Sequence, residues 1–282
     1  MPVAVVTDST ASLPAELVTR HRLTVVPLTV VIDGVEGRDG IDVTPAEVAR
    51  ALRQRRVSVS TSRPAPDEFV RVYERLLDAG ADGVVSVHLS ARFSGTLEAA
   101  ALAAATFDGR VVVVDARSTG MGLGFPALAA AEAAAQGGDV TAVRAAAQAA
   151  VARTHALFCV DSLEFLRRGG RISVASALLG TALSVKPILR VVDGTLVSQE
   201  KVRTTSRALA RLIDLAVEAA GESEVDIAVH HLADEGRALP IAATLAERLG
   251  PRLRDRYVIE IGGVVAAHVG PGLVGVVVHR RA

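Results

Sequence analysis

The sequence predicts an α/β protein of two domains, with a doubly wound, mainly parallel N-terminal sheet and a C-terminal α+β domain with antiparallel strands. In the first half, short β-branched runs alternate with alanine-rich stretches of helical length, which is typical of strand–helix–strand units. In the second half, Asp193-Gly194 between two apolar runs indicates a β-hairpin, and helices surround it. We expect the boundary near Arg153–His155, which divides the chain into domains 1–154 and 155–282.

Four strands joined by helices are expected in the first half. Thr44, Pro45 and Glu47 form a capping box with proline at the first helical position. Parallel strands connected by such helices form a sheet that is covered on both faces. The predicted strands are Val3–Val6, Val25–Ile32, Gly83–Leu89 and Val111–Asp115, and the predicted helices are Leu13–His21, Pro45–Arg53, Pro66–Ala79, Gly95–Thr106, Met121–Gln136 and Val140–Arg153.

The second half is expected to mix antiparallel strands with helices. A short helix stops at Gly169-Gly170, and no linker rich in proline, glycine or serine marks the domain boundary, so the domains are expected to pack closely. The predicted strands are Ala156–Val160, Pro187–Val192, Thr195–Gln199, Val225–Leu232, Tyr257–Ile261 and Leu273–His279, and the longer helices are Thr204–Ala220 and Glu235–Leu249.

The composition argues against several classes of function. Lysine plus arginine and aspartate plus glutamate both number 31, so the chain lacks the basic surface of a nucleic-acid binder. The start at Met1 has no features of a signal peptide, and charged residues interrupt the alanine-rich stretches before a membrane-spanning length. Cys159 is the only cysteine, so no internal disulfide forms. We expect a cytoplasmic protein with no stable membrane insertion.

Serine and threonine cluster where the chain leads into predicted helices. At the carboxyl edge of a doubly wound sheet, loops of this kind gather around ligands, and helix N-termini add free N–H groups and partial positive charge. Hydroxyl groups there form a neutral cradle for a small anion. The alternative is helix capping, because the same residue types are the preferred N-caps. The clusters are Thr7–Thr10, Ser58–Pro64, Ser90–Thr96 and Asp115–Gly120.

Two glycine-rich segments imitate nucleotide-binding motifs. Gly122–Ala127 fits G-x-G-x-x-A, but its glycines do not directly follow a strand. Gly270–Gly275 fits G-x-G-x-x-G, but it leads into a strand instead of a helix. His230 and His231 point to opposite faces of a predicted strand, so they cannot chelate one metal. We expect neither a cofactor nor a metal.

Five segments, taken together, resemble the DegV family. Val5–Thr10 is similar to the opening of the family, and four further segments follow in family order over nearly the whole chain. Each is a weak signal alone, and the combination is specific. The four segments are Ser60–Pro66, Phe93–Thr96, Leu166–Ser173 and His268–Gly272.

The resemblance implies a lipid-binding protein that holds one long-chain fatty acid at the domain interface. The first domain would carry the hydroxyl-rich head-group loops, and the second would contribute the acyl-chain tunnel. Thr61 and Ser94 would hydrogen-bond the carboxylate, with His268 near the head group. The full set of implied ligand-binding residues is Thr61, Ser62, Ser94, Gly95 and His268.

The resemblance also implies a protein partner. A separate ATP-dependent fatty-acid kinase would phosphorylate the bound carboxylate, and the acyl phosphate would feed phospholipid synthesis. Arg171 and Arg203 would lie near the entrance, as contacts to the partner or to phosphate. On this interpretation the chain is a substrate carrier and not itself an enzyme.

Several positions depart from the family pattern. Arg63, Phe93 and Ala116 stand where glutamine, leucine and serine are usual, and they bear on chain-length preference and on the head-group network. The segment Val174–Ile188, rich in alanine and leucine, is a candidate wall for the acyl chain, and its alternative is ordinary core.

Two other functions stay open from the residues alone. Ser94 and His268 could form an acyl-enzyme in a stand-alone serine-type esterase, although the sequence shows no residue that orients His268. The chain could also be a kinase subunit for a small polar substrate. An esterase would turn over a chromogenic ester, a polar-substrate subunit would release no lipid on denaturation, and a carrier would copurify with fatty acid.

Overall fold

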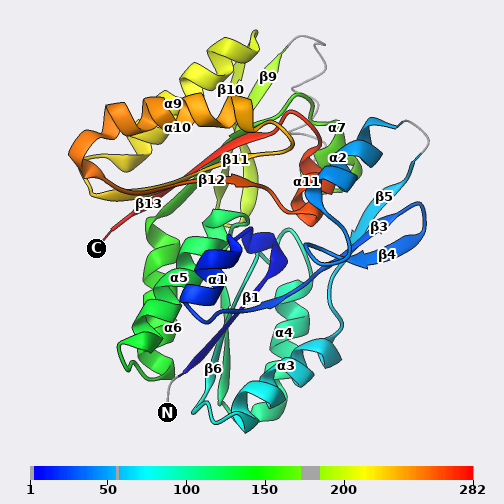
Figure 1. Cartoon of the computed structure of the whole chain (residues 1–282), viewed down its shortest axis with the longest axis vertical. Helices are drawn as coiled ribbons and strands as arrows, with labels where there is room; N and C mark the ends of the chain where they lie inside the picture. The colour runs from blue at the N-terminus through cyan, green and yellow to red at the C-terminus, as the bar shows by residue number, and fades with distance from the viewer. Residues whose placement is uncertain (1–2, 55–56, 173–184, 282) are drawn as a thin grey trace.

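Three β-sheets organise the molecule (Figure 1). The computed structural model describes residues 3–54, 57–172 and 185–281. In Figure 1 a parallel sheet with its helices occupies the lower part, a largely antiparallel sheet the upper part, and a small sheet the right-hand side. Most of the candidate wall at Val174–Ile188 falls on residues 173–184, which lie outside the described residues.

The first half folds into the predicted doubly wound sheet. Its strands lie in the order β2-β1-β6-β7, and each neighbouring pair is parallel. Val5 and Val85 pack against α5 and α6 on one face, whereas Val6 and Val84 pack against α3 and α4 on the other. The elements are β1 (Ala4–Asp8), α1 (Ala15–Arg20), β2 (Thr24–Val26), α3 (Pro66–Asp78), β6 (Val84–His88), α4 (Thr96–Ala104), β7 (Val111–Asp115), α5 (Met121–Ala135) and α6 (Val140–Arg153).

The second half forms the predicted mixture of helices and antiparallel strands. Its strand order is β10-β9-β8-β13-β11-β12, and among the described strands of this sheet β11 and β12 form the one parallel pair. Asp193 and Gly194 turn the predicted hairpin with φ angles of 47° and 78°, the left-handed conformations of a type I′ turn. The elements are β8 (Thr154–Cys159), β9 (Lys186–Val192), β10 (Thr195–Val202), α9 (Thr205–Ala220), β11 (Val225–His231), α10 (Glu235–Leu249), β12 (Leu253–Glu260) and β13 (Val274–Arg280).

The two faces of this six-stranded sheet have different partners. α9 and α10 cover one face and form an apolar core with it. On the opposite face, Ala228 and Val277 pack into the core that surrounds α5. The larger sheets are therefore joined through a shared apolar layer.

Two predictions were wrong in the region of the small sheet. Val25–Ile32 is not one strand, because Pro27 has no N–H and the chain passes there from the parallel sheet into a second sheet. Ser58–Pro64 is not simply a loop, because it contains a strand in which Thr61 lies opposite Val30. The three antiparallel strands, in the order β4-β3-β5, are β3 (Thr29–Ile32), β4 (Val35–Arg38) and β5 (Val59–Ser62).

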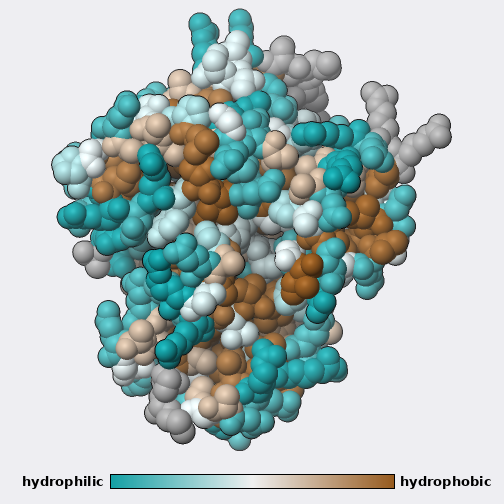
Figure 2. All heavy atoms as spheres, viewed as in Figure 1, coloured by the Kyte–Doolittle hydropathy of each residue, from teal (hydrophilic) through white to brown (hydrophobic). Residues whose placement is uncertain are grey.

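Apolar side chains are exposed beside this small sheet, where Figure 2 shows a hydrophobic area at the right of the molecule. Val35 is 72% exposed and Ile41 is 61% exposed. Neither residue lines the cavity described below. No helix within the described ranges is long and apolar enough to cross a membrane.

A short helix, α11 (Gly263–Val269), has no counterpart among the predicted elements. Gly262 and Gly263 at its start are typical of a turn, and seven residues show too little helical periodicity to be recognised. It packs against α2 (Pro45–Arg53) and α7 (Glu164–Arg168). α2 begins at the predicted capping box. Because α11 carries His268, its placement matters for the site.

The carboxylate of Asp8, at the end of β1, is fully buried and joins two loops. Its Oδ1 accepts the N–H of Thr10 at 3.0 Å and the hydroxyl of Thr10 at 2.5 Å. Its Oδ2 accepts the N–H of Leu89 at 3.0 Å and lies 2.9 Å from Nδ1 of His88. The other ring nitrogen of His88 lies 2.6 Å from the Ser86 hydroxyl. Asp8 thus fixes the chain after β1 against the chain after β6.

Replacing Asp8 leaves a buried imidazole and two buried N–H groups without their acceptor. We expect Asp8→Ala to lower the free energy of unfolding by about 3–5 kcal/mol, measured by urea denaturation. Glu16→Ala is the control, because Glu16 forms an exposed ion pair with Arg20, and such pairs contribute about 0.5 kcal/mol or less. A loss for Asp8→Ala as small as that of the control would show that Asp8 does not organise these loops.

Candidate functional site

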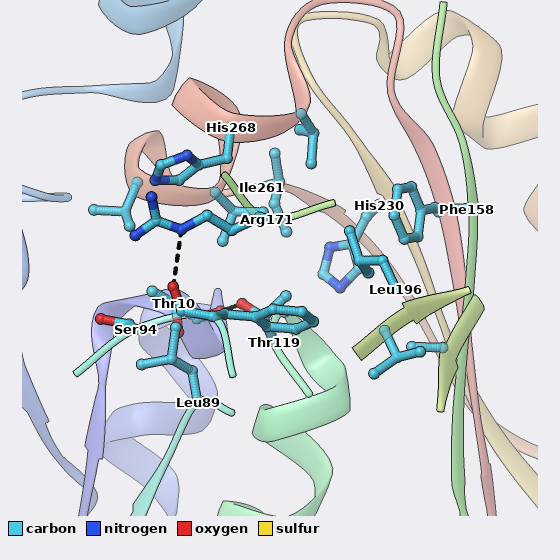
Figure 3. A pocket seen from close by; sticks show the side chains of 18 of the residues that line it. Thr10, Leu89, Ser94, Thr119, Phe158, Arg171, Leu196, His230, Ile261 and His268 are labelled. Carbon is cyan, nitrogen blue, oxygen red and sulfur yellow. Dashed lines mark hydrogen bonds between the residues drawn. The ribbon is translucent and has the colours of Figure 1, made fainter. Parts of the chain in front are cut away.

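A cavity lies where the three sheets meet (Figure 3). Its volume, including the open mouth, is about 960 Å³. The ends of the parallel strands, β5, the inner face of the six-stranded sheet and α11 all contribute to its wall. Most of the lining is aliphatic or aromatic, including Leu28, Leu89, Phe93, Phe158, Leu196 and Val277.

A group of polar side chains gathers on one side of this cavity, although His230 lies on the opposite side. In Figure 3, His268, Arg171 and Ser94 lie on that side, and Phe158 and Leu196 lie on the other. Thr61 Oγ1 is 2.9 Å from His268 Nε2, which joins β5 to α11 across 207 residues of sequence. The cavity therefore brings together Thr61, Ser94 and His268, three residues that are far apart in the chain.

Ser94 lies in the loop between β6 and α4. Its Oγ is 2.9 Å from Thr96 Oγ1 and accepts the N–H of Thr96 at 3.3 Å, so it also caps the start of α4. Binding and capping, the two alternatives for a hydroxyl cluster, are thus compatible at this residue. Ser62 lines the cavity beside Thr61, whereas Gly95 is not among the lining residues.

Arg63 links the two hydroxyl-bearing segments. Its guanidinium donates to the Gly95 carbonyl at 3.1 Å and to the Glu98 carboxylate at 2.9 Å. A Cβ atom on Gly95 would lie 2.1 Å from Arg63 Nη1, so this approach depends on glycine. This departure from the family pattern therefore ties the end of β5 to the start of α4.

The two candidate arginines have different positions. Arg171 lines the cavity, and its Nε donates to the Phe93 carbonyl at 2.9 Å, drawn as a dashed line in Figure 3. Its Nη1 also donates to the Gly169 carbonyl. Burial lowers the pKa of Arg171 but leaves it a cation at neutral pH. Arg203 is exposed after β10 and is not among the residues that line the cavity.

The imidazole of His268 is neutral at pH 7. Burial, and to a smaller extent the charge of Arg171, lowers its pKa to about 4. The ring packs closely on Gly169, where a Cβ atom would lie 2.4 Å from Nδ1. No carboxylate among the described residues raises this pKa. His268 therefore offers a neutral nitrogen to the cavity.

The arrangement suits binding better than nucleophilic catalysis. Within the described residues, the Ser94 hydroxyl is paired with Thr96 and His268 Nε2 with Thr61, so Ser94 and His268 do not form a nucleophile–base pair. The described residues also contain no group of three or more His, Cys, Asp or Glu side chains placed to hold a metal ion.

Three further polar residues line the cavity. Thr10 and Thr119 belong to two of the predicted hydroxyl clusters, but nothing in their segments distinguishes them from the other hydroxyls. His230 was considered in the sequence only as a metal ligand and rejected, because the neighbouring histidine points to the opposite face of the predicted strand. Its Nε2 accepts the N–H of Met121 at 2.9 Å, and burial lowers its pKa to about 4. His230 thus joins β11 to the start of α5 beside the cavity.

Known proteins show the same sequence pattern over the whole chain. A family model described as "Uncharacterised protein, DegV family" matches residues 2–281. The chain belongs to the DegV family. A DegV domain-containing protein of Streptomyces coelicolor is 51% identical over 279 residues, which cover 99% of each chain. A DegV domain-containing protein of Mycobacterium tuberculosis is 46% identical over 279 residues, which cover 99% of this chain and 97% of the relative.

Solved DegV structures share the fold and confirm the predicted fold class. The structure described as "Fatty Acid Binding of a DegV family Protein from Thermus thermophilus" is 34% identical, covers 100% of both chains and superposes with a TM-score of 0.90. The one described as "DegV, a fatty acid binding protein from Bacillus subtilis" is 33% identical, also covers 100% of both chains and has a TM-score of 0.89. The resemblance identified from five short segments is confirmed.

The low pKa of His268 makes a prediction about pH. In the ligand-free protein we expect His268 to titrate near 4, followed by NMR of the imidazole signals and assigned with His268→Gln. Because the pKa is lower in the folded protein than in the unfolded chain, the unfolded chain binds more protons between the two values. His268 therefore makes the folded protein less stable as the pH falls from about 6.5 to about 4. A midpoint near 6.5 would contradict the buried placement.

Proposed function

We propose that this protein binds one long-chain fatty acid, with the carboxylate beside Thr61, Ser94 and His268 and the acyl chain along the apolar wall. The observation that carries the proposal is the group of Thr61, Ser94, Arg171 and His268 on the wall of a cavity whose lining is mostly apolar. Related DegV proteins from Thermus thermophilus and Bacillus subtilis are described as fatty-acid binding, which supports the same ligand class here.

The chemistry of the cavity fits this ligand. Each buried CH₂ contributes about 0.8 kcal/mol, so a tail of about fifteen carbons supplies on the order of 12 kcal/mol before ordering costs. The carboxylate must replace the hydrogen bonds that it loses from water. The hydroxyls of Thr61 and Ser94, the imidazole of His268 and the nearby cation Arg171 supply suitable partners.

We further propose that the bound acid is presented to a separate ATP-dependent fatty-acid kinase, which converts the carboxylate to an acyl phosphate for phospholipid synthesis. Use of ATP implies that this exchange takes place in the cytoplasm. Arg171 is placed to meet a phosphate at the head group, and Arg203, which is exposed, is available to the partner surface. On this proposal the chain is a carrier, and catalysis belongs to the kinase.

We also propose that the chain divides into domains 1–154 and 155–282. Thr61 and Ser94 then belong to the first domain, and Arg171 and His268 to the second. The head-group site is then shared between the two domains, in keeping with a carboxylate held at their interface.

The most direct test is to identify what the protein carries. We expect purified protein, extracted with organic solvent, to release about one fatty acid per chain, detected by mass spectrometry. The same protein should not turn over a chromogenic ester, because Ser94 and His268 are not paired. Absence of any lipid after purification and after incubation with fatty acids would refute the proposal.

Comparing a fatty acid with its methyl ester tests where the carboxylate binds. We expect Thr61→Ala and Ser94→Ala each to weaken binding of a fatty acid about tenfold, since each removes a hydrogen bond to a charged group worth roughly 1.5 kcal/mol. Binding of the corresponding methyl ester, which carries no charge, should change less. Thr244→Ala, at an exposed hydroxyl on α10 that bonds the Pro240 carbonyl, is the control. Equal losses for acid and ester would place the carboxylate elsewhere.

A further inference from the structure

A buried acid lies at the opposite end of α11 from His268. Asp39, in the turn between β4 and α2, is 3% exposed. Its Oδ1 accepts the N–H of Gly263, the first residue of α11, at 2.8 Å across 224 residues of sequence. α11 has no capping side chain of its own, because its N-cap residue is Gly262. Asp39 therefore supplies the cap from a distant part of the chain.

Two glycines allow the Asp39 carboxylate to come this close. A Cβ atom on Gly262 would lie 3.2 Å from Oδ2, and one on Gly263 would lie 3.0 Å from Oδ1. A side chain at either position would force the carboxylate to shift by a few tenths of an ångström. These two glycines made α11 hard to recognise from the sequence. Their contact with Asp39 explains why they are there.

Among the described residues, no cation lowers the pKa of the buried Asp39 carboxyl group. Burial raises its pKa and so does the nearby carboxylate of Asp8, whereas the hydroxyl of Ser9 and the N–H groups of Gly263 and Val264 lower it. A buried carboxylate held in this way costs solvation free energy. In return, the carboxylate fixes the position of the first turn of α11. The helix dipole favours a negative group at that end.

Asp39 is itself firmly placed relative to the cavity. Its N–H donates to the Leu28 carbonyl at 2.8 Å, and the Leu28 side chain lines the cavity. Asp39 does not line the cavity. Any effect of Asp39 on a ligand must therefore pass through the elements that it holds.

We propose that Asp39 is a positioning residue for the head-group site, which holds α11 where His268 meets Thr61. The inference rests on the proposed function and adds a residue that never touches the ligand. Gly263 and His268 are separated by about 7.5 Å along the helix axis. Because α11 is short, a shift of its first turn moves the imidazole with it.

The first test needs no ligand. In Asp39→Ala the imidazole of His268 should leave its buried position, and its pKa should rise from about 4 toward 6.5 in an NMR titration. Asp39→Asn keeps an acceptor oxygen for the Gly263 N–H, so it should keep the low pKa. Asp42→Ala is the matched control, because Asp42 lies in the same turn and pairs with Arg38. An unchanged titration of His268 in folded Asp39→Ala overturns the inference.

If Asp39→Ala does not fold, Gly263→Ala tests the same contact from the helix side. The added methyl group would lie 3.0 Å from Asp39 Oδ1 and 3.0 Å from Val48 Cγ2, so the carboxylate must shift by a few tenths of an ångström. We expect a smaller rise in the pKa of His268 than in Asp39→Ala, in the same direction. A low pKa retained in Gly263→Ala would then overturn the inference.

The second test separates this inference from the proposed function. Asp39→Ala should weaken binding of the fatty acid roughly tenfold, because the free energy of one helix cap corresponds to about that change in affinity. Binding of the methyl ester should stay nearly unchanged. If acid and ester weaken equally, Asp39 has only a structural role and the inference fails. If the wild-type protein binds neither ligand, the proposed function fails, and the titration of His268 still decides the role of Asp39.

Discussion

The cavity depends on the buried carboxylate of Asp8. A parallel sheet ends in loops that diverge unless something joins them, and Asp8 accepts hydrogen bonds from the chain after β1 and from the chain after β6. Thr10 and Leu89, which donate these bonds through their main-chain N–H groups, both line the cavity. The acid at the end of the first strand therefore stabilises the cavity wall, and neighbouring hydroxyls such as that of Thr119 are left to face a ligand.

The parallel sheet alone forms only an open edge, and later parts of the chain close it. β5 brings Thr61 over the edge as part of a separate small sheet, and α11 brings His268 to meet it. The six-stranded sheet supplies the far wall through residues such as Phe158 and Leu196. Closure by segments distant in sequence explains how hydroxyls from one half and an imidazole from the other share one site.

The sequence predicted elements well where local signals were strong and failed where tertiary contacts decide. The capping box at Thr44 and the turn at Asp193-Gly194 are local, and both are confirmed. The strand at Val59–Ser62 was missed because its small polar residues are stabilised by pairing with β3. α11 was missed because its glycines serve a contact with Asp39. Thr61 and Ser94 were accessible from the hydroxyl clusters, whereas His268 and Arg171 required the family resemblance.

The charges around the proposed head-group site determine how the protonation of His268 changes when a ligand binds. In the free protein, burial and Arg171 keep His268 neutral, so the imidazole adds no positive charge that would repel Arg171. A carboxylate bound where we propose would reverse the balance, because an adjacent negative charge favours the protonated imidazole. Fatty-acid binding would then be coupled to proton uptake at mildly acidic pH. The same hydrogen bond to Thr61 that orients the neutral ring in the free protein would have to be shared with the ligand.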